Sequence, residues 1–321
     1  MAFLFRSIII VFIFWAGFLF VGLDMAGAAK SEKAKVYFTR DISPEAMQKL
    51  YRLVNQHIAG KVAVKIHTGE PNGPNIIPRD MVKAVVEIIP GSTIVETNVY
   101  YPSPRQTTEG HRQVLQTNGW TFAPVDILDE EGSVSLPVSG GVWFKEVAMG
   151  SHIINYDSLV VLTHFKGHTT GGFGGALKNI AIGLPSGKEG KKQMHSLDDQ
   201  QFGIKEKRFM EHMAESGKAA MGHFGPRMAY INVLRNMSVD CDCTGVNASP
   251  PSVPDIGILA STDILAVDQA SVDMIYALSE DVRTHLAERI ESRHGLHQLE
   301  AMEKMGMGSR EYELVIVDQG E

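Results

Sequence analysis

The chain has 321 residues, of which 44% are hydrophobic and 21% are charged, and its formal net charge at pH 7 is −7. These values are typical of a globular protein with a sizeable core, in one large or two medium domains. Because the charge balance is acidic, we expect no basic surface for nucleic acid and no nucleic-acid partner.

The N-terminal segment 1–29 has the pattern of a secretory signal peptide. Arg6 precedes an apolar run over residues 8–23, and small residues follow at 26–28. The pattern predicts a periplasmic or secreted protein. An uncleaved membrane anchor is the alternative, because the run is slightly long for a cleaved signal and slightly short for a membrane span. In that case the membrane is contacted only through this segment.

The chain after this segment begins with alternating strands and helices. A strand, a helix, a strand, a helix and a strand are predicted in that order, at residues 35–38, 44–59, 61–66, 78–88 and 93–97. Ser43 is the expected N-cap of the first helix, with Pro44 in its first turn. This order is typical of a parallel sheet with helices on its faces.

The remaining elements are expected to continue this pattern. They are a short helix at 109–117, a surface excursion at 126–141, a helix-like stretch at 145–154, strands at 159–162, 256–260 and 312–317, and helices at 176–182, 202–218, 263–278 and 282–292. The predicted fold class is therefore α/β, with mostly parallel sheets and flanking helices. We expect residues 30–321 to form two α/β lobes, 30–150 and 151–321, with a cleft between them.

A loop rich in histidine, lysine and glycine lies between strand 159–162 and helix 176–182. It contains His164, Lys166, His168, Gly171, Gly172, Gly174 and Gly175, and Lys178 follows one turn into the helix. Glycines between a strand and a helix let the backbone approach a ligand and point free N–H groups at an anion or a cofactor phosphate. A tight turn that needs glycine for packing is an equal alternative. The pattern matches neither a Walker loop nor a dinucleotide-binding motif.

Three side chains of this loop alternate along the chain. If the strand continues, His164, Lys166 and His168 share one face at its carboxyl end, where open α/β sheets usually bind ligands. Two imidazoles and a lysine suit metal binding or proton transfer, whereas a single histidine more often has a structural role. Lys178 is either a solvated helix residue or an amine of the site.

Cys241 and Cys243 are the only cysteines in the chain. Two thiolates cannot hold a four-cysteine iron–sulfur cluster, so we expect none from this chain alone. They can supply half of a zinc-type site that histidines complete, and a strained disulfide or free thiols are the alternatives. His111 and His195 are further candidate ligands, and each can equally be structural.

Five longer segments carry a resemblance to known proteins. They are VAVKIHTGEP (62–71), THFKGHTTGGFGGALKNIAIG (163–183), KKQMHS (191–196), DCDC (240–243) and VPDIGILASTDILAVDQAS (253–271). Together they resemble the bacterial and archaeal family labelled domain of unknown function 362, also described as iron–sulfur centre proteins. Many members carry a ferredoxin-like insertion rich in CxxC motifs, which this chain lacks.

The loop HTTGGFGGALK is also similar, over few residues, to the lactate racemase family. In that family a histidine and a lysine ten residues apart hold a nickel-pincer nucleotide. The resemblance implies that His168 and Lys178 occupy these two positions, and that His195 and His111 fill the other histidine roles.

The sequence therefore predicts a secreted or periplasmic protein that binds a metal ion or a metal-containing cofactor and acts on a small anionic substrate. The alternative is a non-catalytic protein that binds a metal or an anion. The candidate catalytic residues are His164, His168 and Lys178. The candidate cofactor-binding residues are Gly171, Gly172, Gly174, Gly175, Lys166 and Lys178. The candidate metal ligands are His168, His195, His111, Cys241 and Cys243.

Overall fold

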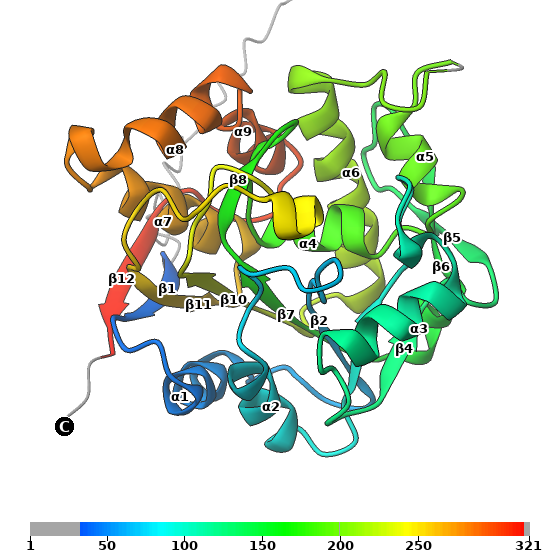
Figure 1. Ribbon diagram of the computed structural model, residues 1–321, viewed down its shortest axis with the longest axis horizontal. Helices are drawn as coiled ribbons and strands as arrows, with labels where there is room; N and C mark the ends of the chain where they lie inside the picture. Colours follow the sequence, from blue (N-terminus) through cyan, green and yellow to red (C-terminus); the bar gives the residue numbers. More distant parts are fainter. Residues whose placement is uncertain (1–32, 199, 318–321) are drawn as a thin grey trace, which may run out of the picture. The chain divides into compact units, whose positions relative to one another are not determined.

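The computed structural model describes residues 33–198 and 200–317, in which eight strands form one sheet (Figure 1). The order of the strands is β12-β1-β11-β10-β7-β2-β3-β4. Their bounds are β1 Ala34–Thr39, β2 Val62–Lys65, β3 Thr93–Glu96, β4 Val125–Ile127, β7 Ser158–His164, β10 Met228–Leu234, β11 Gly257–Ser261 and β12 Tyr312–Ile316. Neighbouring strands are parallel, except that β11 runs antiparallel to β1 and β10. The predicted α/β class with a mostly parallel sheet is confirmed.

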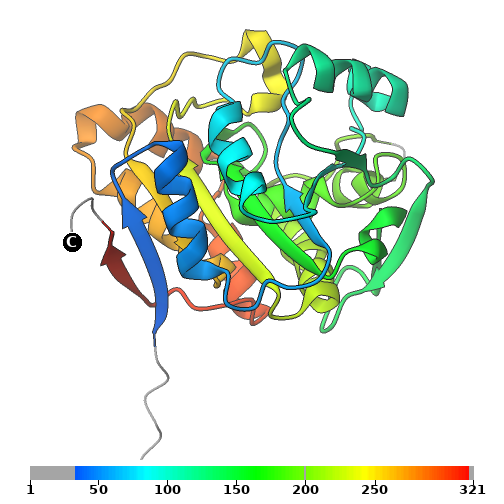
Figure 2. The same ribbon diagram turned by 90° about the horizontal axis from the view of Figure 1, so that it is seen from below.

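Helices cover both faces of this sheet (Figures 1 and 2). The first face carries α1 (Pro44–Val54) and α2 (Arg79–Glu87), and Ser43 caps α1 as predicted. The second face carries α4 (Ala176–Gly183), α6 (Glu206–Phe224), α7 (Ile264–Tyr276), α8 (Glu280–Ser292) and α9 (His297–Lys304). The remaining helices are α3 (Thr108–Thr117), α5 (Gly190–His195) and three 3-10 turns, η1 (Pro104–Gln106), η2 (Ser151–Asn155) and η3 (Asp242–Asn247).

The central strand β7 shows why the sequence forms this layered structure. Leu159 and Val161 belong to the apolar cluster under α4, α6 and α7, whereas Val160 and Leu162 belong to the cluster under α1 and α2. Successive side chains of a strand point to opposite faces, so a strand that is covered on both sides is apolar throughout. All seven residues of β7 are buried.

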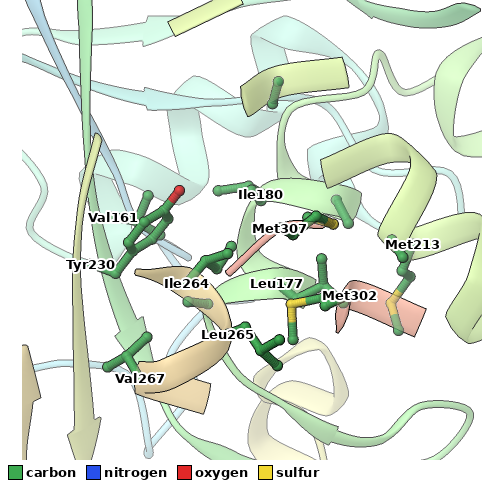
Figure 3. Close-up of a cluster of buried hydrophobic side chains, with 14 of the residues drawn as sticks. Val161, Leu177, Ile180, Met213, Tyr230, Ile264, Leu265, Val267, Met302 and Met307 are labelled. Carbon is green, nitrogen blue, oxygen red and sulfur yellow. The ribbon is translucent and has the colours of Figure 1, made fainter. Parts of the chain in front are cut away.

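The helices of the second face are held by one apolar cluster (Figure 3). Val161 and Tyr230 come from the sheet, Leu177 and Ile180 from α4, and Ile264 from α7. This packing anchors α4, which begins directly after the glycine-rich loop. The helix predicted at 176–182 is therefore confirmed and is anchored by its own apolar side.

One sequence-based expectation is not confirmed, and another differs from the structure. The cleft between two lobes is not confirmed, because β2 and β7, from the two halves of the chain, are neighbours in one sheet. The helix-like stretch at 145–154 is wrong, because these residues form β6 (Glu146–Gly150), followed by η2. In β6, Val147 and Met149 alternate into the core while the strand pairs with β5 (Ser133–Pro137).

The predicted signal segment, 1–29, lies outside the described residues. In the part of the chain that is described, no helix is both long enough and apolar enough to cross a bilayer.

Candidate functional site

A cavity of about 280 Å³ lies at the carboxyl ends of β2 and β3. After β2 the chain builds β3 and β4 on one side of the sheet, whereas after β7 it builds β10 on the other side. The pair β2 and β7 is therefore a topological switch point, where open α/β sheets bind their ligands. Lys65 and Glu96, the last residues of β2 and β3, both line the cavity.

The structure brings most of the predicted site residues to this cavity. His168 lies at the end of β8 (Lys166–His168), Lys178 in α4 and His195 at the end of α5, and all three line the same space. Lys166, Cys241, Cys243, Gly174 and Gly175 line it as well. The lining residues do not include His164, His111, Gly171 or Gly172.

His168, Cys241 and Cys243 form the candidate metal cluster. One ligand atom from each residue lies within 4.8 Å of the others. Two cysteines and one histidine are a donor set that zinc uses at catalytic sites with an open fourth position. His195 and His111 are not part of this cluster.

The sulfur of Cys241 is surrounded by donors. The Nζ of Lys178 lies 3.5 Å from Sγ, and the backbone N–H of Cys243 donates to it at 3.4 Å. The hydrogen bond from the Cys243 side chain and, after it, Lys178 hold the pKa of Cys241 well below its usual value despite burial. The same bond, with burial, raises the pKa of Cys243 well above its usual value. Cys241 is therefore the sulfur of the pair that ionises to a thiolate first.

Lys178 is the counter-ion of this thiolate. Burial alone would lower the pKa of Lys178, but the charge of Cys241 outweighs burial and raises that pKa. The ammonium group therefore stays charged, and it competes with any metal ion for the same sulfur.

The hydrogen bonds of His168 fix where its proton is. Its Nδ1 accepts the N–H of Gly171 at 2.8 Å and the N–H of Thr170 at 3.3 Å. Burial lowers the pKa of His168, so the ring is neutral and carries its proton on Nε2. Coordination of a metal through Nε2 requires the loss of that proton or a change in the backbone around Gly171.

His164 does not line the cavity but contacts Asp242, which pairs with the lining residue Lys166. Its Nδ1 lies 2.9 Å from each carboxylate oxygen of Asp242, and its Nε2 lies 2.6 Å from the carbonyl oxygen of Arg235. Asp242 also forms an ion pair with Lys166 at 3.0 Å. Burial would raise the pKa of Asp242, but His164 and Lys166 outweigh it and hold that pKa well below its usual value. His164 therefore orients Asp242, which in turn holds Lys166 at the cavity.

His111 is part of a buried ionic network. Its Nε2 accepts from Nε of Arg105 at 3.2 Å, and its Nδ1 lies 3.3 Å from Oδ1 of Asn98. Burial first, and Arg105 second, lower the pKa of His111 to about 2. Arg105 forms ion pairs with Glu70 at 3.1 Å and with Glu96 at 3.0 Å. Both ring nitrogens of His111 are engaged, so the structure gives this residue no free lone pair for a metal.

His195 lies among aromatic rings at the cavity. Its ring stacks on Phe209 at a centroid distance of 5.0 Å and meets Phe202 edge-on at 5.3 Å. Burial, together with the positive groups nearby, lowers its pKa to about 3. His195 is therefore a neutral ring at the site.

The N-terminus of α4 is not available to an anion. The backbone N–H groups of Ala176 and Leu177 donate to the carboxylate of Asp268 at 2.7 and 2.9 Å. A Cβ on Gly175 would lie 2.4 Å from an oxygen of Asp268, and one on Gly172, where φ is +77°, would lie 2.6 Å from the Cα of Gly295. At these two positions the geometry supports glycine for packing rather than glycine as an anion cradle.

Several residues of the site do not appear among the sequence-based candidates. They are Lys65, Glu96, Arg105, Lys191 and Asp242. A signal existed for two of them, since Lys65 and Glu96 are charged residues that end apolar strand segments. Lys191 and Asp242 lie inside the KKQMHS and DCDC segments. Arg105 lies in a proline-bounded loop and has no comparable signal.

Comparison with known proteins gives one family and distantly similar solved structures, two of which are described below. A family model described as domain of unknown function (DUF362) matches residues 62–273. The lactate racemase apoprotein from Thermoanaerobacterium thermosaccharolyticum has a TM-score of 0.41 and 11% identity, over 77% of this chain and 57% of that chain. A protein from Thermotoga maritima has a TM-score of 0.40 and 9% identity, over 82% and 59%. This chain thus spans less than two thirds of either structure, and no curated protein matches it.

Proposed function

The chain belongs to the DUF362 family, and we propose that it binds a thiophilic metal ion and a small anion side by side in the cavity at the carboxyl ends of β2 and β3. The observation that supports this proposal is that one cavity is lined both by the His168, Cys241 and Cys243 cluster and by several cationic side chains. In the reaction, the metal ion and the small anionic substrate would be bound next to each other in this cavity.

The metal part of the proposal rests on the donor set. Thiolate sulfur selects soft or borderline ions such as zinc over magnesium or calcium. Cys241 ionises more readily than Cys243, and Cys243 must also lose its proton to become the second sulfur ligand. When bound, such an ion supplies a Lewis acid that polarises an oxygen of the substrate. Lys178 then remains beside the centre as a cation.

The anion part rests on the cationic groups of the lining, of which Lys191 forms no ion pair with a described residue, and on an unsatisfied ring nitrogen. The cavity is lined by Lys65, Arg105, Lys166, Lys178 and Lys191. His67 adds a ring nitrogen, Nε2, that is buried and has no hydrogen-bond partner among the described residues. A buried polar atom without a partner is unusual in a folded protein and is satisfied when a polar ligand binds beside it.

His168 and Lys178 are the proposed catalytic residues, since both contact the cavity and both border the thiolate. A non-catalytic binding protein is the alternative within the same pocket. Replacing His168 or Lys178 abolishes turnover in the first case and only weakens binding in the second.

A second candidate function, without metal, is favoured by two observations. Lys178 already neutralises Cys241, and His168 holds its proton on the nitrogen that a metal would need. In this case the thiolate of Cys241 is the reactive group, and His168 and Lys178 stabilise it by donation.

Elemental analysis of the full chain, isolated from its native compartment, tests the metal proposal. We expect about one thiophilic ion per chain in the wild type and a loss of about tenfold or more in Cys241→Ser and Cys243→Ser. His212→Gln, a change at a buried histidine outside the cluster, serves as the control and retains the metal. A wild-type chain that holds no metal while both thiols are free contradicts the proposal and favours the metal-free thiolate.

We also propose that the protein works in the periplasm or outside the cell, on the basis of residues 1–29. The intact mass of the isolated protein tests this. Loss of the mass of about the first 29 residues supports export with cleavage, and a full-length chain in the membrane fraction supports an anchor.

A further inference from the structure

Lys191 differs from the other cationic groups of the cavity because it forms no ion pair within the described residues. We propose that the cavity binds an organic monocarboxylate, with the carboxylate on the Nζ of Lys191 and the apolar body against Val99, Ile182 and Phe202. This inference rests on the anion-binding part of the proposed function and is independent of the metal.

The other lining cations are each matched by an anionic neighbour. The pairs are Lys65 with Glu96 (3.0 Å), Arg105 with Glu70 (3.1 Å), Lys166 with Asp242 (3.0 Å) and Lys178 with the thiolate of Cys241 (3.5 Å). Matched pairs attract a further anion weakly, because the partner repels it at almost the same distance. These four cations therefore shape the wall but do not set the charge of the ligand.

Lys191 is 5% exposed and touches only neutral oxygens. Its Nζ donates to Oγ1 of Thr97 at 2.6 Å and to the backbone oxygen of Asn98. An ammonium group has three hydrogens, and within the described residues the third has no acceptor. A buried ammonium without a direct ion-pair partner is costly, so an anion that reaches this hydrogen is favoured.

The rest of the lining limits the ligand to one charge and a small body. Val99, Ile182 and Phe202 supply apolar surface, which a carboxylate with a hydrocarbon body covers and a compact dianion does not. A second negative group would face only matched cations. It would also find no free helix N-terminus, because Asp268 already accepts from the first N–H groups of α4.

Binding at Lys191 is coupled to protonation. Burial lowers the pKa of Lys191 to about 7; Asp129 and Glu96 oppose that shift, and Arg105 and Lys65 add to it. A carboxylate favours the charged amine, so it takes up a proton when it binds above pH 7. The affinity is then full below pH 7 and falls as the pH rises.

Other titratable groups also line the cavity, so the Lys191 variants are needed to assign the effect. Burial lowers the pKa values of His67 and His195, which favours their neutral forms. Burial also lowers the pKa of Lys65. A loss of affinity with rising pH that disappears in the Lys191 variants therefore reports on Lys191.

Calorimetric titration of the full chain with butanoate tests the inference, with butanamide as the neutral analogue and succinate as the dianion. We expect butanoate to bind at pH 6, with about 100-fold lower affinity at pH 9, two units above the pKa of Lys191. Lys191→Met and Lys191→Gln should weaken binding at pH 6 by about tenfold or more and remove the pH dependence. Lys192→Met, at the exposed neighbouring lysine, should bind as the wild type does.

Three results with the wild type overturn the inference: no binding of butanoate, equal binding of butanamide, or binding of succinate about tenfold more tightly than butanoate. The inference is also overturned if both Lys191 variants are folded by circular dichroism and bind butanoate as the wild type does. The metal content of the same samples separates this result from the metal proposal. If a metal-free chain binds butanoate, the carboxylate inference is supported and the metal proposal is contradicted. If a metal-loaded chain binds no butanoate, the metal proposal is supported and the carboxylate inference is contradicted.

Discussion

Glu96 is the acid around which the polar wall of the cavity is arranged. It pairs with Lys65 and Arg105 at 3.0 Å each, and it accepts the N–H of Thr68 at 2.8 Å. Burial would raise the pKa of Glu96, but Lys65 and Arg105 outweigh it and hold that pKa well below its usual value. The carboxylate is therefore ionised, and removing its charge leaves Lys65 without an ion-pair partner among the described residues and Arg105 with Glu70 alone.

We expect Glu96→Gln to lower the free energy of unfolding by about 3–5 kcal/mol, because breaking a buried ion pair leaves a charge without a partner. Urea unfolding at pH 7 measures this loss. Glu87→Gln is the control, since Glu87 forms only an exposed pair with Lys83 at 3.7 Å, and it should cost less than about 1 kcal/mol. Equal losses in the two variants would contradict the role of Glu96.

The same residue predicts an effect of pH. Because the pKa of Glu96 is lower in the folded than in the unfolded chain, its stabilisation is present above an unfolded pKa of about 4.3. The stabilisation is lost as the pH falls through the lower folded pKa. Unfolding measured from pH 6 to pH 2 should therefore show a smaller loss of stability in Glu96→Gln than in the wild type. Parallel curves for the two proteins would count against this assignment.

The sequence predicts those residues of the site that lie close together along the chain or that stand out by residue type. His168, Lys178 and Gly175 lie within eleven positions of each other, and the DCDC segment stands out by its cysteines. Glu96 was missed because a charge at the end of a strand suggests a solvated position, whereas helices cover both faces of this sheet. The environment of His111 depends on Arg105, and its hydrogen bonds have no signature in the sequence.

At the scale of elements, α4 owes its position to α7. Asp268 in α7 accepts the N–H groups of Ala176 and Leu177, and it also accepts from Nδ2 of Asn232 in β10 at 2.8 Å. The helix itself was predictable from its sequence, but its cap was not, because Asp268 lies more than ninety positions away along the chain. A cap from a distant helix is a tertiary contact that local patterns do not contain.

We expect Asp268→Ala to lower the free energy of unfolding by about 2–4 kcal/mol, because two buried N–H groups lose their acceptor. Ser43→Ala is the matched control. Ser43 accepts a single N–H, that of Ala46 at 3.1 Å, as the N-cap of α1, so its loss should cost about 1 kcal/mol. Urea unfolding compares the two variants. If Asp268→Ala lowers the free energy of unfolding no more than Ser43→Ala does, the hydrogen bonds between α4 and Asp268 of α7 are not important for stability.

At the scale of the molecule, the two predicted halves share one sheet. Val64 in β2 is in register with Val160 in β7, and Ala229 in β10 is in register with the same residue from the other side. The βαβ pattern predicted the parallel pairing of β2 and β3 correctly. It did not predict that β1 lies between β11 and β12, because strand order depends on long-range packing rather than on local sequence.

A shared sheet predicts that the described part of the chain opens as one unit. Native-state hydrogen exchange should give β2 (Val62–Lys65) and β10 (Met228–Leu234) opening free energies that agree within about 1 kcal/mol, because both pair with β7 and neither can leave without exposing the apolar clusters on both faces. The exposed edge strand β12 (Tyr312–Ile316) is the internal control and should exchange at a lower opening free energy. If the two lobes were independent, β2 and β3 would open together, with an opening free energy several kcal/mol lower than that of β10. That outcome would separate the residues of the cavity, since Lys65 and Glu96 come from β2 and β3 while Lys178 lies in α4.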